Sequence, residues 1–306
     1  MLVDAGHEMV MLSVGFDSSV GGPGTKRSRV IEIPQLAKFR DVQKFLNGEG
    51  SVNFWEDTAV HQSLQGWCDM QVLYSEQCRD EVLQPELLER LKSEKFDAAY
   101  VESYSHMSYV LFHLLDINKF AITDSVAIND GWFYYTQSPS NPAYVPTEMG
   151  AIAMEKMNFV ERLYNTYVYS LVAYFYVRNS VTFQSTIQEK FPDLPPFRDL
   201  LGDNSLVFVN SEPLVDFPRP SSSRIIDIGG IVVSSIHEPL NNTWSNIMDL
   251  RPNTVFLSFG TFAKAYLIPE QYKRTIVENV KKFPNVTFIW KYERPEHNIF
   301  LREWII

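Results

Sequence analysis

The sequence predicts an α/β protein whose strands form parallel sheets with helices on both faces. Short apolar runs at residues 96–101, 119–122 and 254–257 are typical of buried strands. Helical patterns separate these runs along the chain, which is the order found in strand–helix–strand units of a parallel sheet. The 306 residues, 45% of them hydrophobic, are enough to build one large or two ordinary domains.

The charge balance argues against some classes of partner. The formal net charge is −10, which disfavours binding to nucleic acid or to an anionic membrane surface. No apolar stretch approaches the roughly 20 residues that a membrane-spanning helix needs. Cys68 and Cys78 lie on one predicted helix at a rise of roughly 15 Å, so we expect them not to form a disulfide with each other.

The first residues resemble the end of a helix. Residues 1–7 contain Asp4 and lack the apolar segment of a signal peptide. Gly6 fits the left-handed position that closes a helix, and a strand is predicted at residues 8–14. We therefore expect that a preceding strand and most of a helix are missing from this chain.

The following residues continue the alternation of helices and strands. The run GGPG at residues 21–24 is a loop and not a phosphate-binding turn, because a short strand at residues 29–33 follows it instead of a helix. Helices are predicted at residues 36–46, 57–83, 85–93 and 105–115. The strand at residues 96–101 has Glu102 at its carboxyl end.

A long helical pattern at residues 151–190 is dense in aromatic side chains. One stripe along it consists of Val160, Tyr164, Tyr167, Leu171, Tyr174 and Phe175. Residues 164–177 are apolar nearly all round, yet this length is too short to span a bilayer. The pattern favours packing in the core, and the wall of an apolar ligand pocket or a face touching a membrane are the alternatives.

The C-terminal part contains a second strand–turn–helix unit. Strands are predicted at residues 205–210 and 225–231, and the polar, proline-containing residues 237–253 are typical of a linker. The strand at residues 254–257 leads into the turn Ser258-Phe259-Gly260-Thr261, a helix beginning near Pro269 and a strand at residues 285–291. Such a turn either presents N–H and hydroxyl groups to an anion or simply ends the strand.

Several motifs, in the same order along residues 1–298, resemble those of the animal UDP-glucuronosyltransferase and UDP-glycosyltransferase family. AGHEMV at residues 5–10 is similar to the family's "aGHeVt" entry to its second strand. LSFGT at residues 257–261 resembles its "SLGS/SFGS" loop, and FIWK at residues 288–291 its "vlWr/fiWk" strand. NPAYVP at residues 141–146, Glu161-Arg162, NSEPLVDFPRP at residues 210–220 and Gly229-Gly230 also fit.

The resemblance implies the GT-B architecture, which is two Rossmann-like domains. Residues 1–236 would be the acceptor-binding domain, residues 237–253 the linker, and residues 254–306 the incomplete start of the donor-binding domain. The implied reaction transfers a sugar from a UDP-sugar to a small lipophilic acceptor with inversion at the anomeric carbon. The UDP-sugar is a co-substrate, and the resemblance implies no further cofactor and no metal.

The resemblance also assigns candidate site residues. Glu102 stands where the family has an acidic residue, often Asp, which orients a catalytic histidine and stabilises the charge that this base acquires. Ser258, Gly260 and Thr261 lie in the loop that resembles the donor-phosphate contact. Trp290 is either near the nucleotide or in the core.

The chain also departs from the family pattern. None of its six histidines matches the family's base, and His106 lies only one helical turn beyond Glu102. We expect the base to precede Met1, and the main nucleotide-binding segment and the C-terminal membrane anchor to follow residue 306. The chain alone is therefore expected to be inactive.

Two further expectations depend on this resemblance. A non-catalytic isoform that binds a full-length relative, as a homo- or hetero-oligomer, is the alternative function. The family resemblance places the protein at the endoplasmic reticulum membrane, although no signal or anchor is present in this sequence.

Overall fold

The computed structural model describes residues 2–14, 24–33, 55, 60–127, 130–136, 138, 140–149, 156–201, 206–233, 239–260 and 263–294. Three features named above lie outside these residues: the helix predicted at residues 36–46, most of the GGPG run, and Thr261. Cys68 and Cys78 are both buried and free, as their spacing predicts.

A four-stranded parallel sheet forms the centre of the N-terminal part. Its strands are β3 (Ala99–Glu102), β4 (Phe120–Asp124), β5 (Leu206–Val209) and β6 (Ile225–Asp227), and they lie in the order β3-β4-β5-β6. The prediction of a parallel α/β sheet is thus confirmed. The strand expected at residues 225–231 ends early because Gly230 turns the chain with a φ of 76°.

Strands β1 (Val10–Val14) and β2 (Arg29–Ile33) form a second parallel pair. Ile31 lies within the same hydrophobic core as Val101, Ile122 and Val207 of the four-stranded sheet. The side chains of Arg29 and Glu94 form an ion pair that joins β2 to the end of a neighbouring helix. The two-stranded sheet therefore packs against the N-terminal core.

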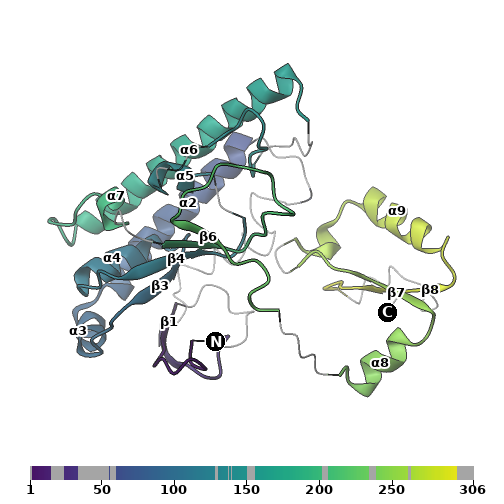
Figure 1. Cartoon of the computed structure of the whole chain (residues 1–306), viewed down its shortest axis with the longest axis horizontal. Helices are drawn as coiled ribbons and strands as arrows, with labels where there is room; N and C mark the ends of the chain where they lie inside the picture. The colour runs from purple at the N-terminus through teal and green to yellow at the C-terminus, as the bar shows by residue number, and fades with distance from the viewer. Residues whose placement is uncertain are drawn as a thin grey trace.

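The helices of the N-terminal part are α2 (Val60–Gln77), α3 (Pro85–Ser93), α4 (His106–Leu114), α5 (Trp132–Thr136), α6 (Phe159–Gln188) and α7 (Phe197–Leu200). A single π-helical turn, η1 (Cys78–Val82), continues α2. Figure 1 shows α2 and α6 running side by side, and these two helices are in contact. Tyr109 on α4 and Phe183 on α6 are among the most deeply buried side chains.

Helix α6 begins at Phe159 and not at residue 151 as predicted. The side chain of Asn158 accepts hydrogen bonds from the N–H groups of Val160 and Glu161, and the Glu161 carboxylate accepts one from the Asn158 N–H. This capping box starts the helix at Phe159.

The expected packing of the aromatic stripe in the core is wrong for most of its members. Tyr167 and Tyr174 are 60% and 61% exposed, whereas Val168 and Val172 are buried. Because this helix is apolar nearly all round, its periodicity alone did not indicate which face turns inward.

The C-terminal part has a separate small core. It contains α8 (Asn242–Met248), β7 (Asn253–Leu257), the 3-10 turn η2 (Ala265–Leu267), α9 (Glu270–Val280) and β8 (Val286–Trp290). Strands β7 and β8 pair in parallel (Figure 1). The side chains of Ala265, Ile268, Val280 and Trp290 pack together in this core. Helix α8 lies inside the segment predicted as a linker, so this segment is partly helical.

Candidate functional site

Glu102 is held at the carboxyl end of β3 by the loop that follows β4. Its Oε1 accepts hydrogen bonds from the backbone N–H of Ser125 at 3.0 Å and from the Ser125 hydroxyl at 3.1 Å. Its Oε2 lies 3.4 Å from the hydroxyl of Thr123, whose single proton is shared with the carbonyl of Val101 at 3.1 Å. The parallel register pairs Glu102 with Thr123, so the end of β4 lies beside this carboxylate. The carboxylate is thus fixed in direction while the residue stays half-buried.

The next strand holds the Ser125 loop from its other side. The Asn210 amide donates to the carbonyl oxygen of Ser125 at 3.0 Å, and the Asn210 N–H donates to the carbonyl of Asp124 at 2.9 Å. Tyr109 lies beneath the same edge, and burial together with the charges of Glu102 and Asp124 raises the pKa of its hydroxyl. The ends of three parallel strands therefore converge on one polar region, as is common for ligand sites in open α/β sheets.

His106 is not available to Glu102 as a base. Its Nδ1 donates to the carbonyl of Tyr104 at 3.3 Å, and its Nε2 lies 3.2 Å from the Ser180 hydroxyl. The ring stacks on Phe197 with centroids 4.7 Å apart. Burial lowers the pKa of His106 to about 4, so the ring is neutral at physiological pH. In the described part of the chain, Glu102 has no hydrogen bond to a histidine.

The NPAYVP loop is attached to α6 by one buried side chain. The amide of Asn165 donates to the carbonyls of Pro142 at 2.7 Å and Val145 at 2.8 Å, and its oxygen accepts from the N–H of Thr147 at 3.0 Å. Three hydrogen bonds of this kind satisfy the whole amide and fix the loop on the helix. The resemblance identified the loop, but not the residue that holds it.

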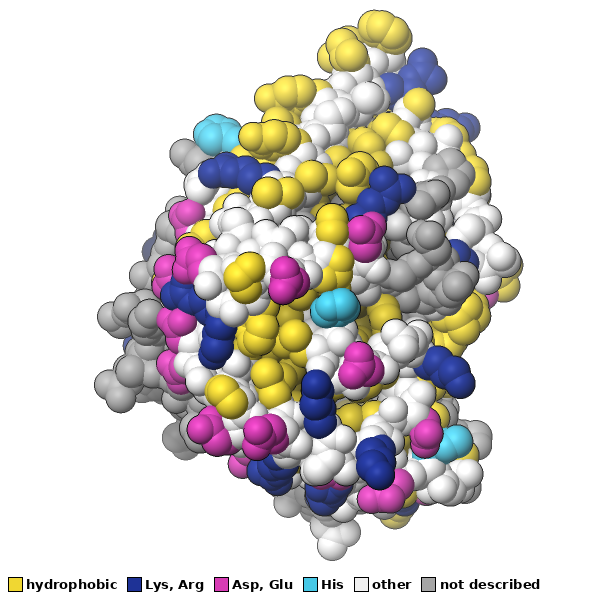
Figure 2. Space-filling model, turned by 90° about the vertical axis from the view of Figure 1, so that its left-hand side faces the viewer, with side chains coloured by type: hydrophobic (Ala, Val, Ile, Leu, Met, Phe, Trp, Pro, Cys, Tyr) yellow, Lys and Arg dark blue, Asp and Glu magenta, His cyan; other side chains and the backbone are white. Residues whose placement is uncertain are grey.

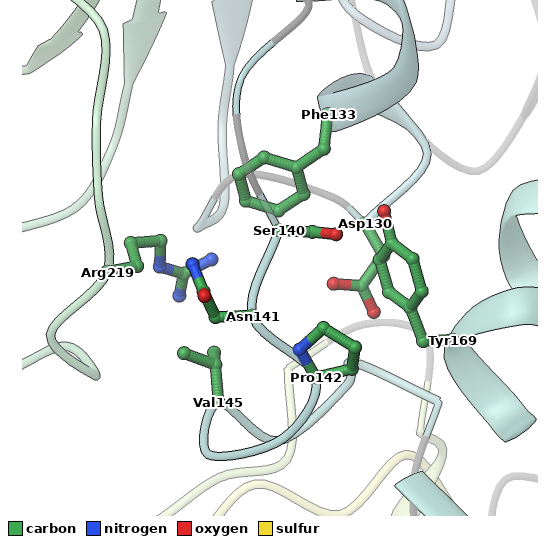
Figure 3. Close-up of a pocket in the computed structure, with 8 residues that line it drawn as sticks. All are labelled: Asp130, Phe133, Ser140, Asn141, Pro142, Val145, Tyr169 and Arg219. Carbon is green, nitrogen blue, oxygen red and sulfur yellow. The ribbon is translucent and has the colours of Figure 1, made fainter. Parts of the chain in front are cut away.

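A small cavity lies between this loop and the segment after β5. It encloses about 10 Å³ and is lined by Asp130, Phe133, Ser140, Asn141, Pro142, Val145, Tyr169 and Arg219 (Figure 3). Arg219 forms an ion pair with Asp216, with two contacts of 3.0 Å. Arg219 Nε and Asn141 Nδ2 are buried and have no hydrogen-bond partner among the described residues.

Asp130 is the ionisable group of this cavity with the largest pKa shift. Its side chain is 7% exposed and accepts a hydrogen bond from the N–H of Glu148 at 3.1 Å. Burial raises the pKa of Asp130 to about 6, against the opposing effects of the Glu148 N–H and the Arg219 charge. A buried carboxyl group that titrates close to neutral pH is an unusual feature of a protein interior.

The second candidate region lies at the carboxyl ends of β7 and β8. The Ser258 hydroxyl accepts a hydrogen bond from the Gly260 N–H at 3.3 Å, and Gly260 has a φ of 76°. The register pairs Leu257 with Trp290, which brings the next residue, Lys291, beside the loop. The Lys291 ammonium donates to the carbonyl of Gly260. The loop therefore combines N–H groups, a hydroxyl and a cation, which is the chemistry of an anion site.

Sequence reasoning overlooked Lys291, although a signal was present. The residue follows directly on the strand that pairs with β7, so strand order alone places it at the loop. Trp290 is 5% exposed and packs in the core of the C-terminal part, edge-on to Tyr292. Its contact with a nucleotide stays a prediction, as does that of Thr261, which lies outside the described residues.

Neither a metal site nor a membrane-spanning helix is present among the described residues. No group of three His, Cys, Asp or Glu side chains comes together there as a metal site requires. No helix among those residues is long and apolar enough to cross a membrane.

Comparison with known proteins yields one family. The family described as "UDP-glucoronosyl and UDP-glucosyl transferase" matches residues 1–305. A Caenorhabditis elegans protein named as the UDP-glucuronosyltransferase ugt-46 is 22% identical over 99% of this chain and 59% of its own length.

Two relatives from other animals have different sugars in their names. UDP-glucosyltransferase 2 of Dactylopius coccus is 31% identical over 55% of this chain and 33% of its own length. The 2-hydroxyacylsphingosine 1-beta-galactosyltransferase of Mus musculus is 28% identical over 76% of this chain and 43% of its own length. The chain thus spans less than two thirds of the length of each of these relatives.

Proposed function

Because the chain belongs to the family of UDP-glucuronosyl and UDP-glucosyl transferases, we propose that it takes part in transferring a sugar from a UDP-sugar to a small lipophilic acceptor. The observation that supports this role best is the carboxylate of Glu102, fixed by Ser125 at the carboxyl end of a parallel strand. The name of the mouse relative, which includes an acylsphingosine, supports a lipophilic acceptor.

The proposed reaction is a single displacement with inversion. A histidine takes the proton of the acceptor hydroxyl, the acceptor oxygen attacks the anomeric carbon, and the bond from that carbon to the UDP oxygen breaks. Glu102 orients the imidazole and stabilises its positive charge, a task that requires a carboxylate held in one direction. The hydrogen bonds from Ser125 support this role because they fix Oε1 and leave Oε2 with one long contact.

The loop after β7 would hold the leaving diphosphate. We assign this contact to Ser258, Gly260 and Thr261, and we add Lys291, whose ammonium lies against the loop. Negative charge develops on the diphosphate as the sugar leaves, and N–H groups, hydroxyls and a cation stabilise such charge. In this proposal Trp290 supports the end of β8 from the core.

We further propose that the 306-residue chain alone transfers sugar slowly or not at all. The lack of a hydrogen bond between Glu102 and a described histidine supports this, as does the burial of His106. Incubation with UDP-glucuronate or UDP-glucose and a phenolic acceptor tests the point. Transfer at an enzymatic rate would mean that the catalytic groups are wrongly assigned.

Binding of UDP tests the donor loop independently of turnover. Titration with UDP up to millimolar concentration should shift the amide NMR signals of Ser258, Gly260 and Lys291. Lys291→Ala should weaken this response, and Lys282→Ala, an exposed lysine at the end of α9, should not. Signals that respond only elsewhere, or no response, would reject the assignment of this loop.

A second candidate function is that of a non-catalytic partner of a longer relative, as a homo- or hetero-oligomer. The same lack of a histidine at Glu102 within the described residues favours it. Co-purification with a full-length family member would support this function, and a chain that stays monomeric beside such a relative would count against it. We place either activity at the endoplasmic reticulum membrane by family resemblance, which cell fractionation tests.

A further inference from the structure

An unusual group of exposed apolar side chains lies along α6. We call it the α6 stripe, and it consists of Phe159, Val160, Leu163, Tyr164, Tyr167, Tyr174 and Val181. Phe159 is 73% exposed and the least exposed member, Tyr164, is 42% exposed. Single exposed apolar residues are ordinary on protein surfaces, but a contiguous series usually marks a binding surface.

The stripe lies on one side of the helix, where the exposed Ser170 and Arg178 stand between its last members. Its members recur at spacings of three, four and seven residues, which places them on the same side of an α-helix. The opposite side packs inward through Asn165, Val168, Val172, Phe183 and Ile187, all of them buried. From Phe159 to Val181 the stripe is roughly 33 Å long at 1.5 Å per residue.

The charge of this helix differs from that of the whole chain. The chain has 37 acidic residues, yet Glu161 is the only one within residues 159–188. The Glu161 carboxylate is engaged by the N–H of Asn158 in the capping box. Arg162 and Arg178 are on the same helix, and Lys156 lies just before it.

Figure 2 agrees with this distribution of charge. Hydrophobic and basic side chains gather at the top of that view, where α6 rises highest in Figure 1, and acidic side chains lie lower. The surface of the helix thus suits a partner that is apolar inside and has phosphate groups at its boundary.

We propose that the α6 stripe docks on the surface of a lipid bilayer, with the helix lying along the interface. Tyrosine has an apolar ring and a polar hydroxyl, which suits the boundary between acyl chains and headgroups. The basic side chains of α6 complement the lipid phosphates. A helix lying in the interface does not have to cross the bilayer, and α6 does not meet the length and hydropathy of a spanning helix.

A second copy of the chain fits this surface less well. Pairing through α6 would bring together two molecules that each have a net charge of −10. The same net charge disfavours attraction to strongly anionic lipid, so binding should depend mainly on apolar insertion. This inference does not rest on the proposed sugar transfer, because it involves no residue assigned to donor or acceptor.

Flotation of the full chain with phosphatidylcholine vesicles tests the proposal. The wild-type chain should float with the vesicles, and binding should change little between low and physiological salt. The double variant Leu163→Ser/Tyr167→Ser should bind at least about tenfold more weakly, since two partly inserted apolar side chains are removed. Phe159→Ser/Val160→Ser, at the start of the helix, should have a similar effect.

The matched control is Leu214→Ser/Val215→Ser. These residues are 90% and 84% exposed and lie outside α6, so their loss should leave vesicle binding unchanged. Circular dichroism checks that every variant remains folded. Equal loss in the control, absence of wild-type flotation, or a dimer in light scattering that only the stripe variants abolish would overturn the proposal.

Discussion

The carboxylate of Glu102 and the backbone of Ser125 are joined by a 3.0 Å hydrogen bond that links the ends of β3 and β4. The Ser125 hydroxyl adds a second bond of 3.1 Å to the same oxygen. Ser125→Ala removes only the second bond, so we expect a loss of about 1 kcal/mol in the free energy of unfolding. Urea denaturation measures it, with Ser221→Ala at an exposed position as the control. An unchanged free energy of unfolding in Ser125→Ala would show that the hydroxyl does not fix Glu102.

Asn165→Ala should destabilise the protein far more than a neighbouring substitution on the same helix. Its amide makes two hydrogen bonds to the NPAYVP loop and one to Thr147 directly after it, and the substitution would leave these three backbone groups without their partner. We expect a loss of about 2–4 kcal/mol in urea denaturation. Hydrogen exchange at the Thr147 N–H should also become faster.

Thr166→Ala is the matched control for Asn165. Its hydroxyl only donates to the carbonyl of Arg162 on the exposed side of α6. This control should change stability by less than about 0.5 kcal/mol. Similar effects of both substitutions would mean that helix propensity, and not the loop attachment, determines the result.

His106 should make the protein less stable in acid. Its pKa of about 4 in the folded state lies below the ordinary value of 6.5, so the unfolded chain binds the proton more readily between these pH values. Stability should therefore fall as pH decreases from 6.5 to 4, by on the order of 3 kcal/mol from this residue. Thermal unfolding of wild type and His106→Gln across this pH range measures the effect, because the difference in stability between the two proteins comes from this residue. If the stability of both proteins changed with pH in the same way, His106 would not be the cause.

Asp130 should have the opposite effect on stability over nearly the same pH range. Its folded pKa of about 6 lies above the ordinary 3.8, so the folded state binds the proton more readily and loses stability as pH rises toward 6. Asp130→Asn retains an acceptor for the Glu148 N–H and removes the buried charge. We expect this variant to be more stable than wild type at pH 7 by on the order of 1–3 kcal/mol, and the difference to be absent near pH 4. A variant less stable at pH 7 would show that pairing with Arg219 outweighs burial.

Gly131 should not tolerate a side chain. A Cβ there would lie 2.2 Å from Cγ of Tyr176 on α6, which is closer than real contacts allow. Gly131→Ala should therefore cost about 1–3 kcal/mol through overpacking. Tyr176→Ala removes Cγ and the whole ring, so in the double variant with Tyr176→Ala the cost of Gly131→Ala should largely disappear. Additive losses in urea denaturation would exclude the clash as the cause.

Much of the fold could be predicted because strand order follows from alternation along the chain. The strand that ends at Glu102 and the strand before Ser258 were both identified from apolar runs with polar residues at their ends. The carboxyl ends of such strands are where site residues gather in parallel sheets. The positions of Glu102, Ser258 and Gly260 at strand ends could therefore be predicted without coordinates, and their roles, which the family resemblance implies, stay predictions.

The remaining features depend on side-chain packing, which periodicity does not report. Residues 164–177 of α6 are apolar on nearly every side, and the inward face is determined by tertiary contacts, among them the hydrogen bonds of Asn165. The three partners of Asn165 lie 18 to 23 residues away in sequence. Contacts over such distances have no local sequence signal.

The attachment of Asn165 also determines the rotational setting of α6. Three hydrogen bonds to a loop on one side of the helix prevent the helix from turning about its own axis without breaking them. Tyr167 lies two residues further on and therefore points outward at an angle that the interior dictates. The direction in which the exposed aromatic side chains of α6 point relative to this loop is therefore fixed by buried contacts and not by the surface itself.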